Sequence, residues 1–224
     1  MFRITRLVPL AFGCLVPFAA QAASEDTAVW GGLHSQFKLN DRVSATVEVQ
    51  KRFNNDASRL GQYVIRPSVS YGFSPTTRGS LGYAFVQTNP PGPAKTDEHR
   101  LWQQLTYRVA AFDGGAVLNG RTRLEQRRID GRDDMGWRLR QQLRFSKPLT
   151  PKVSGVVWSE AFWAANTTDW GQREGLERWR NSVGVSVPLT SRLTLEPGYI
   201  HQWVRRPGED AVDHILSLSL TAQF

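Results

Sequence analysis

The sequence predicts an all-β protein: a single antiparallel, up-and-down transmembrane β-barrel of about 10–12 strands that follows a cleaved signal peptide. We expect residues 1–23 to be the signal peptide and residues 24–224 to form one barrel domain in the outer membrane. Three observations favour this fold. Apolar and polar residues alternate along many long segments, no helical apolar period follows residue 24, and short turns alternate with longer polar loops.

The N-terminus has the features of an export signal. Arg3 and Arg6 form a basic region, residues 7–20 are apolar, and Ala20-Gln21-Ala22 has the small-x-small pattern of a cleavage site. The apolar stretch is too short to span a bilayer as a stable helix, and the alternatives are a buried N-terminal helix or a lipoprotein signal at Cys14. Cys14 is the only cysteine, so the mature chain would hold no disulfide, thiol nucleophile or cysteine metal site.

The alternation is clearest in residues 42–53, 136–145 and 212–224. Within 136–145, the apolar side chains oppose polar ones: Trp137, Leu139, Leu143 and Phe145 against Arg138, Arg140, Gln142 and Arg144. Period two places successive side chains on opposite faces of a strand. Most segments exceed the usual length of a soluble strand and suit a membrane crossing of about 9–11 residues. The pattern therefore predicts apolar residues against lipid and polar residues in a lumen.

The connections divide into two kinds that follow each other along the chain. The predicted strands are 28–39, 42–53, 59–73, 79–88, 98–110, 116–129, 136–147, 152–165, 176–189, 192–206 and 211–224. Short turns between them alternate with longer polar loops, and we place the short turns in the periplasm. This strand count is odd, whereas single-chain bacterial barrels normally have an even one. The first segment could lie inside the barrel, pair in parallel with the last strand, or follow a cryptic strand, and the sequence leaves all three open.

A soluble β-sandwich or a lipocalin-like barrel is the alternative fold. It would place the apolar residues inside and the arginines in water. Strands such as 100–108 and 121–128 carry too few apolar residues to build an apolar core. The polar face therefore favours the membrane barrel.

Several short segments resemble a known family. Three strands share an opening, at Arg100-Leu101-Trp102-Gln103, Arg123-Leu124-Glu125-Gln126 and Arg138-Leu139-Arg140-Gln141. Further matching segments are 30–41, 159–162, 178–185, 197–202 and 214–218. Together they resemble DUF2490, an uncharacterised family of bacterial proteins predicted to be outer-membrane barrels, over nearly the whole mature chain. The resemblance implies fold and location in a Gram-negative outer membrane, and it implies no reaction.

The C-terminal residue predicts a partner. Phe224 resembles the terminal aromatic residue that the outer-membrane assembly machinery recognises in barrel proteins generally. We therefore expect that machinery and outer-membrane lipid to be partners of the chain.

The polar face of the middle strands is rich in charge. A lipid-facing Arg or Lys at the bilayer midplane costs about 2–4 kcal/mol, so these charges are expected to face the lumen. The expected arginines are Arg100, Arg108, Arg121, Arg123, Arg127, Arg138, Arg140, Arg144, Arg178 and Arg180, joined by Glu48, Glu125, Glu160 and Glu196. Arg128 breaks the pattern and should lie near a rim.

Two interpretations of this lumen remain open. Arginine and glutamate side chains could fill a narrow interior and neutralise one another in a structural, non-conducting barrel. Alternatively, the excess of arginine could make a porin-like channel or binding barrel for small anionic solutes. The candidate lumen residues for either role are Arg100, Arg123, Glu125, Arg138, Arg140, Arg144, Glu160, Arg178 and Arg180.

Other function classes find less support. Ser35 and Asp213 are immediate neighbours of His34 and His214 and so point to opposite faces, and no His-x-Ser of outer-membrane lipid hydrolases is present. A lipid-modifying enzyme is therefore the weakest hypothesis, and we expect no catalysis, cofactor or metal. The net charge of +8 is scattered along strand-like segments, and an exported protein is not expected to bind nucleic acid.

Most aromatic residues are expected in girdles at the membrane interfaces. These are Trp30, Tyr63, Tyr71, Tyr83, Trp137, Trp163, Tyr199, Trp203 and Phe224. Trp102 and Trp158 instead project to the polar face, where an aromatic sugar-binding path would need them.

Overall fold

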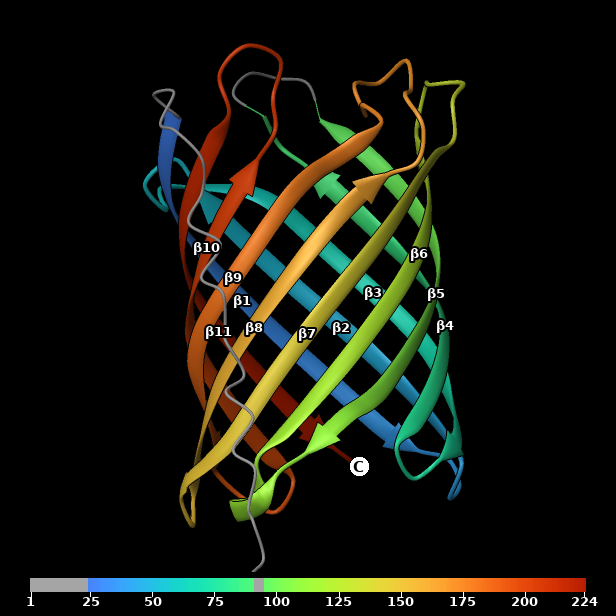
Figure 1. Ribbon diagram of the computed structural model, residues 1–224. Helices are drawn as coiled ribbons and strands as arrows, with labels where there is room; N and C mark the ends of the chain where they lie inside the picture. The colour runs from blue at the N-terminus through green and yellow to red at the C-terminus, as the bar shows by residue number, and fades with distance from the viewer. Residues whose placement is uncertain (1–23, 91–94) are drawn as a thin grey trace, which may run out of the picture.

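The computed structural model describes residues 24–90 and 95–224, so the predicted signal peptide lies outside the described residues. Eleven strands form one closed barrel (Figure 1). The strands are β1 (Ser24–Lys38), β2 (Val43–Asn54), β3 (Arg59–Ser74), β4 (Thr77–Thr88), β5 (Thr96–Ala111), β6 (Val117–Ile129), β7 (Gly136–Thr150), β8 (Val153–Ala164), β9 (Gly175–Pro188), β10 (Leu193–Val204) and β11 (Ala211–Gln223). The predicted barrel is confirmed, and its segments agree with these strands to within a few residues at each end.

The barrel closes through one parallel pair of strands. β1 pairs with β11 in parallel, in a continuous register from Ser24↔Ala211 to Gln36↔Gln223. All other neighbouring strands are antiparallel, including β1 and β2. An odd number of up-and-down strands makes the first and last strands run in the same direction, so closure has to be parallel. Of the three arrangements that the sequence left open, the structure has the pairing of the first strand with the last.

The two rims of the barrel differ in their connections (Figure 1). The lower rim carries the short turns, including a single 3-10 turn at Asp113–Gly115, and also the C-terminus. The upper rim carries the longer loops and the start of β1. In the described ranges no helix is long and apolar enough to cross a membrane.

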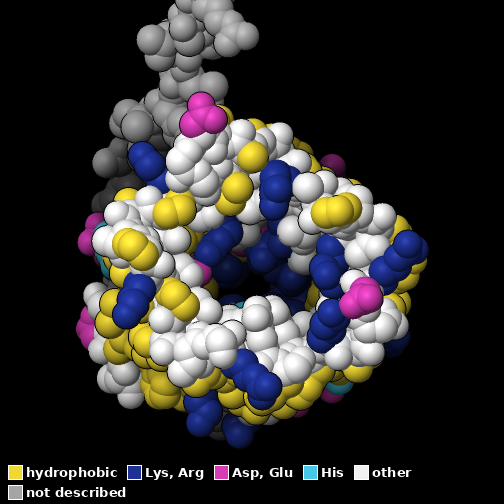
Figure 2. All heavy atoms as spheres, turned by 90° about the horizontal axis from the view of Figure 1, so that it is seen from below, with side chains coloured by type: hydrophobic (Ala, Val, Ile, Leu, Met, Phe, Trp, Pro, Cys, Tyr) yellow, Lys and Arg dark blue, Asp and Glu magenta, His cyan; other side chains and the backbone are white. Residues whose placement is uncertain are grey.

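Apolar side chains cover the outside of the barrel and charged ones lie inside. Leu81 and Leu216 are 61% and 60% exposed, whereas Arg138 is 3% exposed. Seen from the short-turn rim, Lys and Arg side chains border the central opening, and hydrophobic side chains lie around the circumference (Figure 2). This distribution is the reverse of that in a soluble barrel, so the soluble alternative is wrong.

The inner wall also carries two apolar clusters that the alternation alone did not predict. Val64, Ala84, Val86 and Trp102 form one cluster on β3–β5. Ala28, Ile200 and Ile215 form the other at the β1–β11 closure, with Trp30 and Trp158 packed against it. The clusters reduce the space within the barrel and leave the charged residues to line what remains.

Candidate functional site

The lumen contains two cavities that meet at a group of arginines. A cavity of about 860 Å³ extends from the short-turn rim, where Asp41 and Phe224 line it. A second cavity of about 390 Å³ lies toward the long loops and is lined there by residues such as Gln172 and Arg205. The arginines that line both cavities are Arg52, Arg66, Arg140 and Arg180. Any solute crossing the barrel would pass these guanidinium groups, which we call the arginine constriction.

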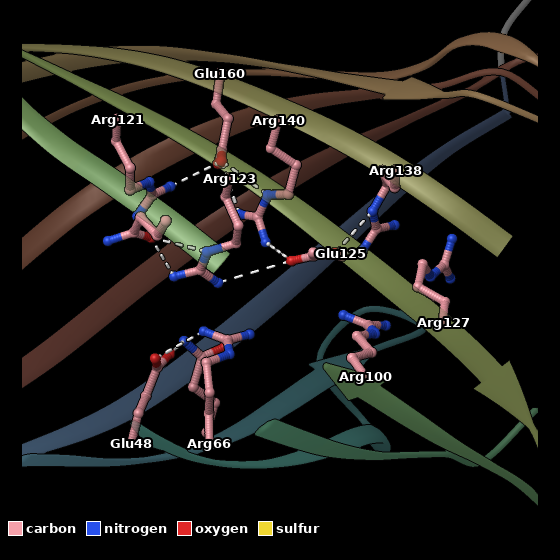
Figure 3. Close-up of polar contacts among 12 residues, drawn as sticks. Glu48, Arg66, Arg100, Arg121, Arg123, Glu125, Arg127, Arg138, Arg140 and Glu160 are labelled. Carbon is pink, nitrogen blue, oxygen red and sulfur yellow. Dashed lines mark hydrogen bonds and ion pairs between the residues drawn. The ribbon is translucent and has the colours of Figure 1, made fainter. Parts of the chain in front are cut away.

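An ion-pair network covers the wall formed by β5–β9 (Figure 3). Glu125 accepts hydrogen bonds from Arg138 Nε at 2.9 Å and from Arg140 Nη1 at 2.7 Å. Glu160 accepts from Arg140 Nε at 2.9 Å and from Arg121 Nη2 at 2.8 Å. Both carboxylates are almost fully buried, at 1% and 2% exposed. Charged groups buried this deeply need partners of opposite charge, and in this network arginines and glutamates alternate so that each contacts the other.

The same network continues toward the long-loop rim. Arg138 Nη1 also donates to Glu177 at 2.7 Å, and Arg127 lies 3.6 Å from the same carboxylate. Arg127 and Arg100 then share Glu98, at 2.6 and 2.8 Å. This wall of the barrel is therefore largely neutralised and held in one arrangement.

Two arginines of the constriction, Arg52 on β2 and Arg180 on β9, have no carboxylate partner among the described residues. Arg52 donates to Gln50 and Gln62, and Arg180 donates to Gln202 at 2.6 Å. The indole of Trp30 lies between them, with the Cζ atoms of Arg52 and Arg180 at 4.1 and 4.8 Å from its ring. Amides and an aromatic face orient the guanidinium groups without cancelling their charge, so this side of the constriction stays positive.

Part of the β8–β9 loop folds into the long-loop end of the lumen. Arg127 donates to Gln172 at 2.9 Å and lies 4.9 Å from the ring of Trp170. Trp170 Nε1 donates to the carbonyl of Asp134 at 2.9 Å, which ties this loop to the neighbouring β6–β7 loop. The loop thereby narrows the smaller cavity.

Asp41 lies in the short turn between β1 and β2, outside the membrane-spanning segments. Lys38 Nζ donates to Asp41 at 2.8 Å and holds the pKa of that carboxyl below its usual range. Asp41 therefore stays negative at the mouth of the larger cavity, opposite in sign to the constriction deeper in.

The predicted lumen residues come together on the inner wall. Arg123, Glu125, Arg138, Arg140, Glu160 and Arg180 surround the middle of the lumen, and Arg100 and Arg178 line the smaller cavity. Arg144 lies nearer the short-turn rim, paired with Glu196 at 2.5 Å. Arg128 lies one residue from the end of β6, as expected for a rim position.

Two expectations are corrected. Arg108 is exposed, beside the register shift between Arg108 and Ala110, and lines neither cavity. Trp30 faces the lumen instead of the interfacial girdle, because it lies on the same face of β1 as His34 and Gln36. Trp102 and Trp158 do face the larger cavity, as expected.

Sequence reasoning missed several lumen residues. The alternation of segment 42–53 already places Arg52 on the polar face, although Arg52 is not among the candidate residues. Arg66 and Glu98 follow the alternation of their strands and could have been found by extending it. Glu177 could not, because a register shift between Phe162 and Trp163 leaves it as an extra residue of β9. Such bulges turn a side chain away from the alternating pattern. Trp170 and Gln172 belong to a loop, where no periodic signal exists.

The described ranges contain no group of three or more His, Cys, Asp or Glu side chains arranged to hold a metal ion. On the outer surface, Tyr199 Oη and His214 Nδ1 lie 2.6 Å apart, and Tyr83 bonds to His99. These contacts orient aromatic side chains near the long-loop rim, where girdle residues are expected.

Comparisons with known proteins identify a family, a full-length relative and a solved barrel structure. The family model described as "Protein of unknown function (DUF2490)" matches residues 27–213. An uncharacterised protein of Methylorubrum extorquens is 37% identical over 232 residues, covering 100% of each chain. Among solved structures, the translocator domain of the autotransporter NalP from Neisseria meningitidis has a TM-score of 0.44 and 12% identity, covering 79% of this chain and 72% of that one. The lumen has to be interpreted from its own residues.

Proposed function

The chain belongs to the DUF2490 family, whose function is unknown, and from this premise we propose that its barrel binds small anionic solutes and passes them through a narrow lumen. The arginine constriction carries the proposal. Arg52 and Arg180 lie where the two cavities meet, and neither has a carboxylate within ion-pair distance among the described residues. Uncompensated positive charge at the point where the two cavities meet attracts anions and repels cations.

The surroundings of the constriction favour passage over mere packing. A cavity opens toward each rim, so that a solute of modest size can approach from either side. The arginines of the ion-pair network are held by carboxylates, whereas Arg52 and Arg180 are held by uncharged amides. A solute anion can replace an amide or aromatic partner of these arginines at a lower cost in free energy than it can replace a carboxylate. Displacing a carboxylate would leave a buried charge unpaired, whereas displacing an amide would not.

Ion conductance in a planar bilayer tests this function. In a gradient of KCl, the wild-type barrel should show a reversal potential of the sign expected for chloride selectivity. Arg180→Gln removes one uncompensated charge and should move the reversal potential toward zero. Arg144→Gln removes a charge that Glu196 already compensates, and its shift should be clearly smaller.

A second variant tests the long-loop end. Trp170→Ala removes the indole that narrows the smaller cavity, and single-channel conductance should rise while selectivity is kept. The proposal is wrong if folded wild-type protein and this variant both conduct no ions.

The competing function is a structural barrel with a filled lumen. The nearly complete pairing of Glu98, Glu125, Glu160 and Glu177 supports it, since such pairing stabilises whether or not a solute passes. Absence of conductance, together with Arg→Gln changes that affect stability alone, would establish this alternative. We also propose that the protein is not an enzyme, and the sequence feature that supports this is the lack of a His-x-Ser of the kind found in outer-membrane lipid hydrolases.

We further propose that the barrel resides in the outer membrane of a Gram-negative bacterium. The apolar outer face and the export signal predicted for residues 1–23 support this location. Phe224, 62% exposed and stacked on Phe37 with ring centroids 5.2 Å apart, is accessible at the short-turn rim as the proposed contact for the assembly machinery. Fractionation of cells into inner and outer membranes tests the location directly.

A further inference from the structure

Four residues that line the larger cavity have a buried hydrogen-bond donor without an acceptor among the described residues. One of them, Arg121, is bonded to Glu160 through its Nη2, and the other three are more deeply buried. Trp102, Arg123 and Arg66 are 3%, 5% and 8% exposed. Trp102 Nε1, Arg123 Nη1 and Arg66 Nε have no hydrogen-bond partner among the described residues, and all three residues line this cavity. Buried donors are nearly always satisfied in folded proteins. Their convergence on one cavity therefore indicates a ligand that supplies acceptors.

The fold holds these donors in place from one side. Arg123 gives its Nε and Nη2 to Gln104, at 2.8 and 2.6 Å, and its Cζ lies 4.1 Å from the ring of Trp102. A Cβ at Gly82 would lie 2.3 Å from Cζ2 of Trp102, so only glycine lets the indole lie flat against β4. Each guanidinium is thus oriented by some of its nitrogens, and the remaining one is left for a ligand.

Arg66 approaches from β3. Its Nη1 donates to Glu48 at 2.7 Å, which leaves Nε free. In Figure 3 the ends of Arg66 and Arg123 lie next to each other in the lumen, and the two guanidinium groups repel each other electrostatically. A bound anion between them would relieve this repulsion.

The local charge balance indicates how much negative charge fits. Glu48 is engaged by Arg66, and Glu125 is engaged by Arg138 and Arg140. The carboxylate within ion-pair distance of Arg123 is Glu125, at 3.7 Å and without a hydrogen bond to it. Among the three residues with free donors, the guanidinium of Arg123 is therefore the one without a hydrogen-bonded carboxylate, and a single ligand carboxylate can supply that partner.

The wall between this point and the short-turn rim is lined with hydroxyl groups. On β2–β5 they come from Ser44, Thr46, Ser68, Ser70, Ser80 and Thr106. Ser70 and Ser80 bond to each other at 2.8 Å, and each hydroxyl can still take part in a further bond. This wall suits a solute whose body carries hydroxyl groups and suits an alkyl chain poorly.

We propose that Trp102, Arg123 and Arg66 form a carboxylate site for a small hydroxylated monocarboxylate, of the sugar-acid class, which enters from the short-turn rim. The inference rests on the proposed function in that it names the solute class of the same lumen. The carboxylate accepts the three free donors, and the hydroxylated body lies along the serine and threonine wall. Arginine and indole N–H groups together give a planar carboxylate two or more charge-assisted bonds.

Calorimetric titration of the purified full barrel in detergent, in low-chloride buffer, tests the class of ligand. Gluconate should bind saturably. Sorbitol, which has the hydroxyls without the carboxylate, should not bind, and hexanoate, which has the carboxylate without the hydroxyls, should bind at least tenfold more weakly. Tighter binding of phosphate than of gluconate would overturn the carboxylate assignment, and so would equal binding of hexanoate.

Variants test the three donors. Trp102→Phe keeps the aromatic ring and removes one donor, and it should weaken gluconate binding by roughly tenfold. Arg123→Gln should abolish saturable binding. Trp163→Phe changes a tryptophan that is 52% exposed and lines neither cavity, and it should leave the affinity unchanged.

The outcomes separate this site from the channel. If the barrel binds gluconate through these donors and passes no current, the proposed site is supported and the proposed channel is wrong. If the barrel conducts anions but does not bind gluconate saturably, the proposed site is wrong and the channel is supported. The site is also wrong if the gluconate affinity of Trp102→Phe and of Arg123→Gln equals that of the wild type.

Discussion

Glu125 connects more of the lumen than any one of its neighbours, because Arg138, Arg140 and Arg123 all lie within ion-pair distance of it. Glu125→Gln would leave those guanidinium groups buried without their shared charge. Breaking a buried pair in this way costs about 3–5 kcal/mol. We expect the urea midpoint of the folded barrel in lipid vesicles, followed by tryptophan fluorescence, to fall accordingly.

The matched control is Glu196→Gln at the short-turn rim. Its partner Arg144 and Glu196 itself keep 31% and 28% of their side chains exposed, so solvent already screens the pair. The expected loss is below about 1 kcal/mol. Equal urea midpoints for the two variants would contradict the central role given to Glu125.

For single residues, the sequence predicts which face of the strand a side chain occupies better than it predicts which side chain it contacts. Alternation correctly assigned Arg138, Arg140 and Glu160 to the lumen, because each lies within a regular stretch of strand. It could not assign which carboxylate each arginine would meet. Arg140 bridges Glu125 on β6 and Glu160 on β8, and such pairs depend on the register of neighbouring strands as well as on side-chain reach. The three free donors of the carboxylate site are equally hidden in the sequence, since Trp102, Arg123 and Arg66 lie on three different strands.

The single strand is the unit that separates lipid from lumen. On β11, Leu218 is 49% exposed on the outer face, and its neighbour Ser219 lines the larger cavity beside Glu196. Leu218→Arg would place a charge against lipid at a cost of about 2–4 kcal/mol near the midplane. Ser219→Arg would place the same charge in the lumen next to a carboxylate.

We therefore expect Leu218→Arg to reduce the yield of folded barrel in a vesicle insertion assay, and Ser219→Arg to fold nearly as well as the wild type. The heat-dependent shift in electrophoretic mobility that marks folded barrels provides the measurement. If Ser219→Arg proved the more damaging change, the assignment of faces on β11 would be reversed.

Strand ends and loops resist prediction for a physical reason. Register shifts occur at Gly72/Ser74, Arg108/Ala110 and Pro148/Thr150, near the short-turn rim. At these shifts side chains no longer alternate regularly between the two faces, and for this reason the expectation that Arg108 faces the lumen was wrong. The inward fold of Trp170 and Gln172 depends on contacts with β6 and with the β6–β7 loop, which no local pattern encodes.

The closure of the whole barrel can be tested by cross-linking. Ser35 and Ala222 are register partners across the parallel pair, and neighbouring strands lie about 4.8 Å apart, within the range for a disulfide. The double change Ser35→Cys and Ala222→Cys should therefore form a disulfide upon oxidation, seen as altered mobility on a non-reducing gel. Cys14, the sole native cysteine, lies within the predicted signal peptide.

The control joins Ser35→Cys with Leu193→Cys. Leu193 is the partner of Ala222 on β10, so it lies two strands from Ser35, at about 9–10 Å, and no disulfide should form. Cross-linking of the control pair, or none in the first pair, would show that β1 does not lie between β11 and β2.

The odd strand count has a consequence for membrane sidedness. In a barrel of even count both chain ends emerge on one side, whereas here β1 starts at the long-loop rim and β11 finishes at the opposite rim. If the short turns face the periplasm, as we propose, Ser24 faces the cell exterior. In that orientation, insertion carries the first residues of β1 across the bilayer, and we expect an epitope joined there to bind antibodies on intact cells.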